Sequence, residues 1–278
     1  MDRSRWRNIT GFDRARLSEA RLTAHYAAQW LARIARGYIL PRADDVHTNL
    51  GWSDSQRALT SHELPGGGSA GLRIPELTLV LWEEGSGGAQ AFPLEGRRDD
   101  DVRKWLGDRL RRMGLDPAAL DAPLPYQMPA HAIGSSAPYA ARALAEPLAE
   151  LATWFGNADL ALGEARQHLL ARGVDAPPVC LWPHHFDLDS LIQLGEGRTI
   201  GAGFSPGDDY YDEPYFYVSR YPAPDVSRLP SLPLRGHWHT HNFTAAIALA
   251  RNVVAAADQQ AESAAFLNAA MDCLIGIG

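Results

Sequence analysis

The spacing of apolar residues changes several times along the chain. Between residues 14 and 36 apolar side chains recur every three or four positions and Gly37 follows as a stop signal, which predicts an amphipathic helix. Beyond Pro41 the apolar runs become short and are separated by Gly and Pro, as in an antiparallel meander. The strands expected there cover residues 48–52, 57–64, 71–74, 77–82 and 90–94.

The same kinds of pattern return in the second part of the chain. Helical spacing predicts helices over residues 100–113 and 138–171, which are joined by a proline-rich connection. Strands follow the second helix, and the Ala-rich sequence near 244–274 predicts C-terminal helices. The later strands are expected at residues 179–182, 186–194, 199–204, 215–220 and 236–242.

The order of these elements indicates the fold class. The sequence helix, strands, helix, helix, strands, helices suggests an α+β protein, with antiparallel sheets from two pseudo-similar halves packed against helices. The halves would be residues 1–120 and 121–278. Because no long polar linker separates them, we expect one compact unit over residues 1–278.

Composition and charge restrict the function further. With 278 residues, 46% of them apolar and 21% charged, the chain can bury a core without a disulfide or a structural metal. Its 26 basic and 33 acidic residues give a net charge of −7, and no dense basic stretch offers a surface for nucleic acid. No run of about 18 apolar residues occurs, so we expect a cytoplasmic protein without a membrane segment. An enzyme, a small-molecule binder and a homo-oligomeric structural protein that associates through its Ala-rich C-terminal helices remain as alternatives.

Histidine residues are concentrated in two short segments, residues 182–187 and 237–241. If both segments are extended, the period of two places His185 with Asp187 and Asp189 on one face of a strand. The three histidines of the second segment likewise share a face. Imidazole and carboxylate groups are the usual ligands of Zn, Fe and Mn in proteins. The expected ligands of a divalent metal are therefore His185, Asp187, His237, His239 and His241.

Such a metal centre predicts a metal-dependent enzyme, a hydrolase or an oxygenase, that acts on a small polar molecule. The metal would polarise a substrate oxygen or lower the pKa of a bound water, with Asp187, His185 and Glu213 as the catalytic groups. A narrower alternative is a non-haem iron oxygenase, in which Arg251 would correspond to the arginine that binds 2-oxoglutarate. Arg251, however, falls in a predicted helix and not on a strand of a jelly roll. The plainer alternative is that the histidines only satisfy backbone groups or stack on neighbouring aromatic rings.

The segment between the two histidine clusters mixes carboxylates, among them Asp208 and Glu213, with tyrosines. Aromatic walls that carry carboxylates are typical of sites for sugars or cations. The alternative to an enzyme is therefore a metal-free module that binds a small polar or cationic molecule. The plainer interpretation is a solvated acidic turn followed by a tyrosine-rich, half-buried strand. In a site of either kind the ligand-binding residues would be Trp182, Asp208, Tyr211 and Tyr215.

Three motifs between residues 178 and 222 carry a resemblance to other proteins. They are a Trp-Pro-His-His-Phe-Asp segment that ends at Asp187, a Gly-Phe-Ser-Pro-Gly-Asp segment from Gly203 and a Glu-Pro-Tyr-Phe-Tyr segment from Glu213. Here the chain resembles an uncharacterised bacterial family, a domain of unknown function, which has small residues in place of the histidine pair 184–185. The resemblance implies an α+β fold and a bacterial cytoplasmic origin, and it supplies no reaction. The matching positions are Asp187, Gly203, Pro206 and Gly207.

The register of the first histidine segment decides which of its two histidines faces the site. On a strand ending at Asp187, His185 shares a face with Asp187. His184 then lies on the opposite face with Phe186 and Leu188, whose apolar side chains mark the core. We therefore expect His184 to be buried and structural, and His185 to be functional.

Overall fold

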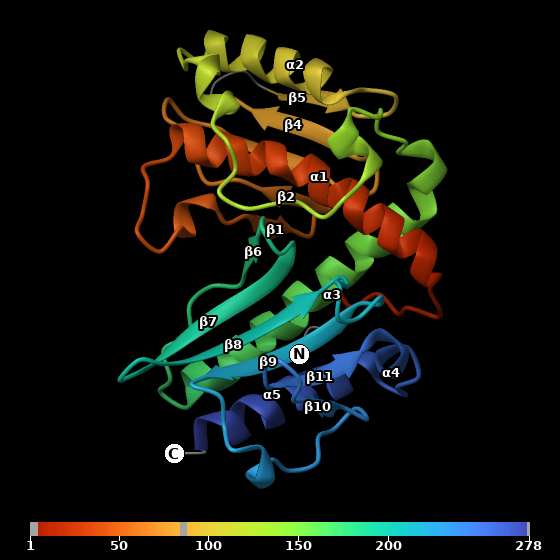
Figure 1. Ribbon diagram of the computed structural model, residues 1–278, viewed down its shortest axis with the longest axis vertical. Coiled ribbons are helices and arrows are strands. Elements are labelled where there is room, and N and C mark those ends of the chain that lie inside the picture. Colours follow the sequence, from red (N-terminus) through yellow and green to blue (C-terminus); the bar gives the residue numbers. More distant parts are fainter. Residues whose placement is uncertain (1–4, 84–87, 277–278) are drawn as a thin grey trace. The chain divides into compact units, whose positions relative to one another are not determined.

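The computed structural model describes residues 5–83 and 88–276, whose contacts divide the chain into two compact units (Figure 1). The N-terminal unit comprises Ala15–Ala152 and the short segment Leu181–Phe186. The C-terminal unit comprises the segment that ends at Arg14, the segment Thr153–Cys180 and the chain from Asp187 onward. Both units are therefore discontinuous in sequence, and their boundaries differ from those of the expected halves.

The N-terminal unit contains the predicted meander. Its described residues form an antiparallel sheet in the strand order β1-β2-β3-β4-β5 (Figure 1). Gly68 has a φ of +91°, and a Cβ there would collide with the carbonyl oxygen of Trp82, so glycine is required where the chain enters β3. The strands are β1 (Gly51–Ser53), β2 (Ala58–Thr60), β3 (Ser69–Arg73), β4 (Thr78–Trp82) and β5 (Ala89–Pro93).

Helices α1 (Arg14–Tyr38) and α2 (Asp99–Arg112) lie at the predicted places, whereas α3 (Ala145–Ala171) begins at Ala145 and not at the predicted residue 138. Helix α1 buries a stripe rich in alanine and leucine, and α2 begins with three aspartates in its first turn, where the helix dipole favours negative charge. Helix α3 carries Pro147 in its first turn, where proline costs no hydrogen bond. Short 3₁₀ helices at Val46–Thr48, Pro117–Asp121, Ala132–Ser135 and Arg142–Leu144 complete the connections.

The C-terminal unit is built on the second antiparallel sheet. Its strand order in the described residues is β10-β11-β9-β8-β7-β6, and only Cys180 of β6 belongs to this unit. Helix α3 continues into this unit from Thr153, and α4 (Ala250–Val254) and α5 (Gln259–Gly276) follow the last strand. The strands are β6 (Cys180–Trp182), β7 (Asp187–Gly195), β8 (Arg198–Ser205), β9 (Tyr215–Tyr221), β10 (His237–His239) and β11 (Ala245–Leu249). A 3₁₀ turn at Val226–Arg228 lies between β9 and β10.

The two faces of the C-terminal sheet differ in chemistry. One face is apolar: Phe204 lies between Trp154 and Phe155 of α3, at ring-centroid distances of 6.0 and 5.9 Å, and α5 packs on β8 and β9. The residues of the opposite face, called the polar face below, alternate with those of the apolar face along each strand, and this face carries polar groups on β7, β9 and β10 and an apolar cluster of Tyr215, Ala245, Ile247 and Leu249 over β11. Its residues are Asp187 and Asp189 of β7, Gly201, Gly203 and Ser205 of β8, Tyr215, Tyr217 and Ser219 of β9, Ala245, Ile247 and Leu249 of β11, and His237 and His239 of β10.

The α+β fold with antiparallel sheets is confirmed, but the expected helix over 244–274 is wrong at its start. Residues Ala245–Leu249 form β11, a strand between β9 and β10 that is buried on both faces. A short apolar run buried on both sides has the same composition as part of a buried helix, so spacing alone does not separate the two. Helix α4 begins only at Ala250, which places Arg251 in a helix as predicted.

The predicted register of the first histidine segment is wrong. Residues 183–186 form a turn between β6 and β7, and Phe186 has a φ of +61°, so the alternation of a strand does not apply. Both His184 and His185 are exposed, whereas Phe186 is buried and stacks on His25 at 4.9 Å. The carbonyl of Pro183 accepts hydrogen bonds from His25 Nε2 and Gln29 Nε2, each at 2.8 Å, which fixes the turn.

Within the described part of the chain, no helix has the length and apolar character needed to cross a membrane.

Candidate functional site

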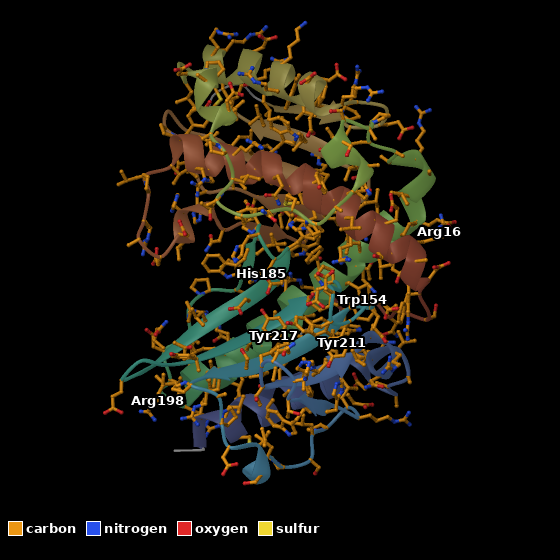
Figure 2. All side chains as sticks on the ribbon, in the orientation of Figure 1. Arg16, Trp154, His185, Arg198, Tyr211 and Tyr217 are labelled. Carbon is orange, nitrogen blue, oxygen red and sulfur yellow. The ribbon has the colours of Figure 1, made fainter. Side chains whose placement is uncertain are left out.

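Tyr217 reaches across the polar face from β9 to β7. In the sheet register Gly203 of β8 lies directly between Tyr217 and Asp189. A Cβ at Gly203 would lie 2.5 Å from the Tyr217 ring and from the carbonyl oxygen of Leu188. Only glycine at this position therefore lets the phenol pass over β8 and meet the carboxylates of the neighbouring strand. Figure 2 labels Tyr217 on this sheet.

The hydroxyl of Tyr217 contacts two carboxyl groups at once. Its Oη lies 2.6 Å from Asp187 Oδ2 and 2.9 Å from Asp189 Oδ2. A phenol has one proton and can donate only one of these bonds, so the other bond requires a proton on the carboxyl group. Burial, and then the neighbouring charge of Asp187, raise the pKa of Asp189 to about 7. We therefore assign the protons so that the Asp189 carboxyl group donates to the Tyr217 hydroxyl, which in turn donates to Asp187.

Part of this cluster is open to solvent and to further hydrogen bonds. Asp189, Tyr217 and Ser219 are half-buried, whereas Asp187 is 7% exposed. The second carboxyl oxygen of Asp189, Oδ1, has no hydrogen-bond partner among the described residues. A methyl group added at Gly201 would lie 3.2 Å from both Asp189 Oδ2 and Ser219 Oγ, so two oxygen atoms converge above a residue without a side chain.

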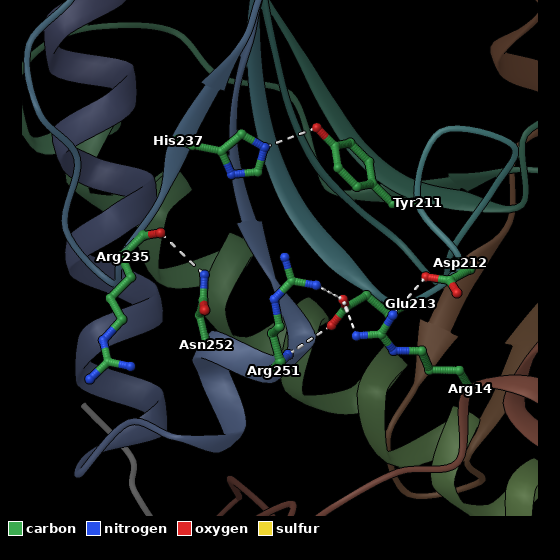
Figure 3. Close-up of polar contacts among 8 residues, drawn as sticks. All are labelled: Arg14, Tyr211, Asp212, Glu213, Arg235, His237, Arg251 and Asn252. Carbon is green, nitrogen blue, oxygen red and sulfur yellow. Dashed lines mark hydrogen bonds and ion pairs between the residues drawn. The ribbon is translucent and has the colours of Figure 1, made fainter.

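A second polar cluster joins Tyr211 to the histidines of β10. Tyr211 Oη lies 3.0 Å from His237 Nε2 and 2.8 Å from His239 Nδ1 (the bond to His237 is drawn in Figure 3). His239 Nε2 lies 2.6 Å from the carbonyl oxygen of His241. Burial, His239 and Arg251 lower the pKa of His237 below its ordinary value. The prediction that His237 and His239 share a face is confirmed, but His241 lies beyond the end of β10 and contributes only its carbonyl group.

Asp208, expected to bind a ligand, holds the loop before β9 together. Its Oδ2 accepts a hydrogen bond of 2.6 Å from the hydroxyl of Tyr215, and its Oδ1 accepts from the backbone N–H groups of Tyr210 and Tyr211 at 2.8 and 3.0 Å. Burial and the charge of Asp208 raise the pKa of the Tyr215 hydroxyl, which keeps it a donor. Asp208 and Tyr215 therefore position Tyr211.

Glu213, expected to be catalytic, is 1% exposed and paired with two arginines. Its Oε1 lies 3.0 Å from the Arg14 guanidinium and also contacts the guanidinium of Arg251, and its Oε2 accepts from the backbone N–H of Arg251 at 3.0 Å (Figure 3). Arg14 also reaches Asp212 at 3.2 Å. With these contacts Glu213 holds the first turn of α4.

The remaining expected site residues lie in the N-terminal unit. Trp182 contacts His184 edge-on at 6.0 Å, and His184 in turn lies beside Tyr126. His185 belongs to this unit, whereas Asp187, its expected partner, belongs to the other. In residues 5–83 and 88–276, no group of three or more His, Cys, Asp or Glu side chains is arranged to hold a metal ion.

Three residues of the polar face, Tyr217, Ser219 and Gly201, were not singled out from the sequence, and Gly203 was named only as part of a motif. Tyr217 and Ser219 alternate along β9, and Gly201 and Gly203 alternate along β8. A Gly-x-Gly pair inside a strand is a signal for a bulky side chain crossing from the next strand. That signal could have directed attention to Tyr217.

No family model, no curated protein and no solved structure matches this chain. The resemblance carried by the motifs around Asp187, Gly203 and Glu213 therefore stays a prediction.

Proposed function

We propose that the polar face binds a small organic cation with a primary ammonium group, without a metal. The observation that supports this most directly is the contact of two aspartates, Asp187 and Asp189, with the single hydroxyl of Tyr217. Two carboxylates so close together hold a proton because a second negative charge is unfavourable there. An ammonium group would supply the missing positive charge and displace that proton.

The donors and acceptors around Asp189 suit an ammonium group. Such a group has three N–H donors and no acceptor. Asp189 Oδ1, a buried oxygen with no partner among the described residues, would accept one of them. Asp189 Oδ2 and Ser219 Oγ, which converge above Gly201, would accept the others. Asp187 and Tyr217 then keep their own hydrogen bond and support the bound charge.

The metal-dependent hydrolase or oxygenase suggested by the sequence has less support than the amine site. The strand alternation that would place His185 and Asp187 on one face is absent, because residues 183–186 form a turn, and the Glu213 carboxylate is paired with arginines. The amine site instead uses groups whose contacts lie within one sheet.

The test is a calorimetric titration with n-butylamine as the probe and n-butanol as its neutral analogue. At about pH 6 we expect amine binding to release close to one proton per site, measured by comparing buffers of different protonation enthalpy. At about pH 8, above the pKa of Asp189, we expect tighter binding and less proton release. Butanol should not bind.

The decisive variant is Asp189→Asn, whose amide can still donate to Tyr217 but carries no charge. It should abolish amine binding and its pH dependence. Asp209→Asn is the matched control, because Asp209 is an exposed aspartate of the loop before β9. Equal binding of butylamine and butanol, or unchanged amine affinity in Asp189→Asn, would refute the proposal.

A further inference from the structure

The contacts of the Tyr211 cluster determine where its protons lie. The carbonyl oxygen of His241 can only accept a hydrogen bond, so His239 Nε2, 2.6 Å away, carries a proton. In the neutral imidazole His239 Nδ1 then presents a lone pair, which accepts the phenol proton of Tyr211 at 2.8 Å. Since that proton is used, His237 Nε2 must donate to Tyr211 Oη at 3.0 Å.

The His239 ring is held in this orientation from two sides. Phe243 stacks on it at 4.1 Å with an interplanar angle of 21°, and Tyr210 packs edge-on at 5.6 Å. A histidine that binds a metal characteristically donates its other ring N–H to a backbone carbonyl, which fixes the tautomer and the direction of the free lone pair. His239 has this arrangement, with Nδ1 as the available nitrogen.

We propose that Tyr211, His237 and His239 form a binding site for a divalent transition metal, with Cu(II) as the preferred ion. The three donor atoms already converge, because both nitrogen atoms lie within 3.0 Å of the same oxygen. Cu(II) prefers square-planar sites, and neighbouring donors on such a metal with bonds of 2.0–2.1 Å are about 2.9 Å apart, close to the two observed distances from Tyr211 Oη to His237 Nε2 and His239 Nδ1, 3.0 and 2.8 Å. Imidazole ligands suit Zn, Cu, Fe and Ni, and among these divalent ions the Irving–Williams order places Cu(II) highest.

Each metal ion that binds replaces one proton of the cluster. The Tyr211 hydroxyl loses its proton to solvent and its oxygen bonds the metal as a phenolate. His239 Nδ1 binds through its existing lone pair. His237 changes tautomer, so that its proton moves from Nε2 to Nδ1 and Nε2 becomes a ligand. One proton is released for each metal bound, and no oxidation or reduction takes place.

This site is distinct from the amine site and from the metal site expected from the sequence. It uses a tyrosine oxygen in place of the side chains of His185, Asp187 and His241. Copper bound by a phenolate gives a charge-transfer band in the visible spectrum, which copper bound only by imidazole or carboxylate groups lacks. The band therefore reports the Tyr211 ligand itself.

The experiment titrates the full chain, prepared without a histidine tag, with Cu(II) and records affinity and visible absorption. Wild type should bind one copper with the phenolate band. Tyr211→Phe keeps the ring but removes the donor oxygen, so it should lose the band and bind copper at least about tenfold more weakly. Tyr221→Phe is the matched control, because Tyr221 is an exposed tyrosine at the end of β9 with no part in the site, and it should keep both.

Folding is checked by circular dichroism, and His239→Gln provides a second variant that should also lose the band. Three outcomes would overturn the proposal: absence of stoichiometric copper binding to wild type, binding without a phenolate band, or unchanged binding and absorption in Tyr211→Phe.

Discussion

Tyr217 reaches its two aspartates only because no side chain stands in its path over β8. Gly203 and Gly201 both lie on the polar face, but they differ in what a Cβ would meet. At Gly203 the nearest atoms are 2.5 Å away and include the backbone oxygen of Leu188, which cannot move without disturbing the sheet. At Gly201 the nearest atoms are side-chain oxygens at 3.2 Å, which can rotate.

Gly203→Ala should therefore destabilise the protein more than Gly201→Ala. We expect a loss of about 1–3 kcal/mol in the free energy of unfolding for Gly203→Ala, because an overpacked site forces strain on the ring and the backbone. Gly201→Ala should cost less than half as much. Urea denaturation of both variants measures the difference, and equal losses would show that Tyr217 does not cross β8 as described.

At the scale of single residues, the sequence predicts which side chains lie near one another better than it predicts which groups they contact. The predictions that Asp208, Tyr211 and Tyr215 belong to one site and that Asp187 and Asp189 share a face agree with the observed contacts and register. Whether a carboxylate faces a ligand, an arginine or a tyrosine depends on strand register and loop shape. For this reason the loop-holding contacts of Asp208 could not be derived from spacing.

At the scale of elements, Glu213 connects three segments that are distant in sequence. Arg14 begins α1, Glu213 lies two residues before the start of β9 and Arg251 lies in the first turn of α4. The backbone contact from Arg251 to Glu213 satisfies an N–H group that the short helix leaves without an intrahelical partner. The carboxylate thus completes the N-terminus of α4 and neutralises part of two positive charges.

Glu213→Gln should lower the free energy of unfolding by about 2 kcal/mol, because a buried charged acceptor is lost while both arginines remain. Asp212→Asn is the matched control. Asp212 contacts the same Arg14, but its side chain is 73% exposed, so water screens the pair and we expect less than about 0.5 kcal/mol. Urea denaturation of both variants measures the two losses. Similar losses would mean that the burial of Glu213 does not determine how much its ion pairs stabilise the protein.

Most strands and helices followed from hydrophobic spacing, and the errors at β11 and at the turn 183–186 have physical causes. The residues of β11 are buried on both faces, so their run of Ala, Ile and Leu carries no alternation that would identify a strand. The turn at residues 183–186 depends on the positive φ of Phe186 and on hydrogen bonds from α1 to Pro183. Contacts with a distant helix leave no mark in the local sequence.

At the scale of the whole molecule, the chain leaves the C-terminal unit after Cys180 and returns at Asp187. The intervening residues belong to the N-terminal unit, and Leu181 exchanges backbone hydrogen bonds with Leu50 there, at 2.9 and 2.7 Å. A division such as 1–120 and 121–278 follows the order of elements along the chain. Units made of several separated segments depend on tertiary contacts, which that order does not contain.

Each unit contains a buried titratable group, and the two groups change the stability of the protein with pH in opposite directions. Burial lowers the pKa of His25 in the N-terminal unit to about 4, so its folded state binds fewer protons than the unfolded chain and stability rises with pH between about 4 and 6.5. Burial and Asp187 raise the pKa of Asp189 in the C-terminal unit to about 7 from its ordinary 3.8. Its folded state binds more protons, so this contribution to stability falls as pH rises from about 4 to about 7.

Because the two effects oppose each other, they partly cancel in the wild-type protein, and single variants should reveal each part. Asp189→Asn removes the falling contribution, so its stability relative to wild type should increase from about pH 4 to about pH 7, by about 1.4 kcal/mol for each pH unit in the middle of that range. His25→Gln removes the rising contribution, so its relative stability should decrease between about pH 4 and 6.5 and then level off. Thermal melts across this range test both signs. A relative stability of Asp189→Asn that stays constant with pH would mean that Asp189 is ionised in the folded state, and the proton assignment at Tyr217 would then be wrong.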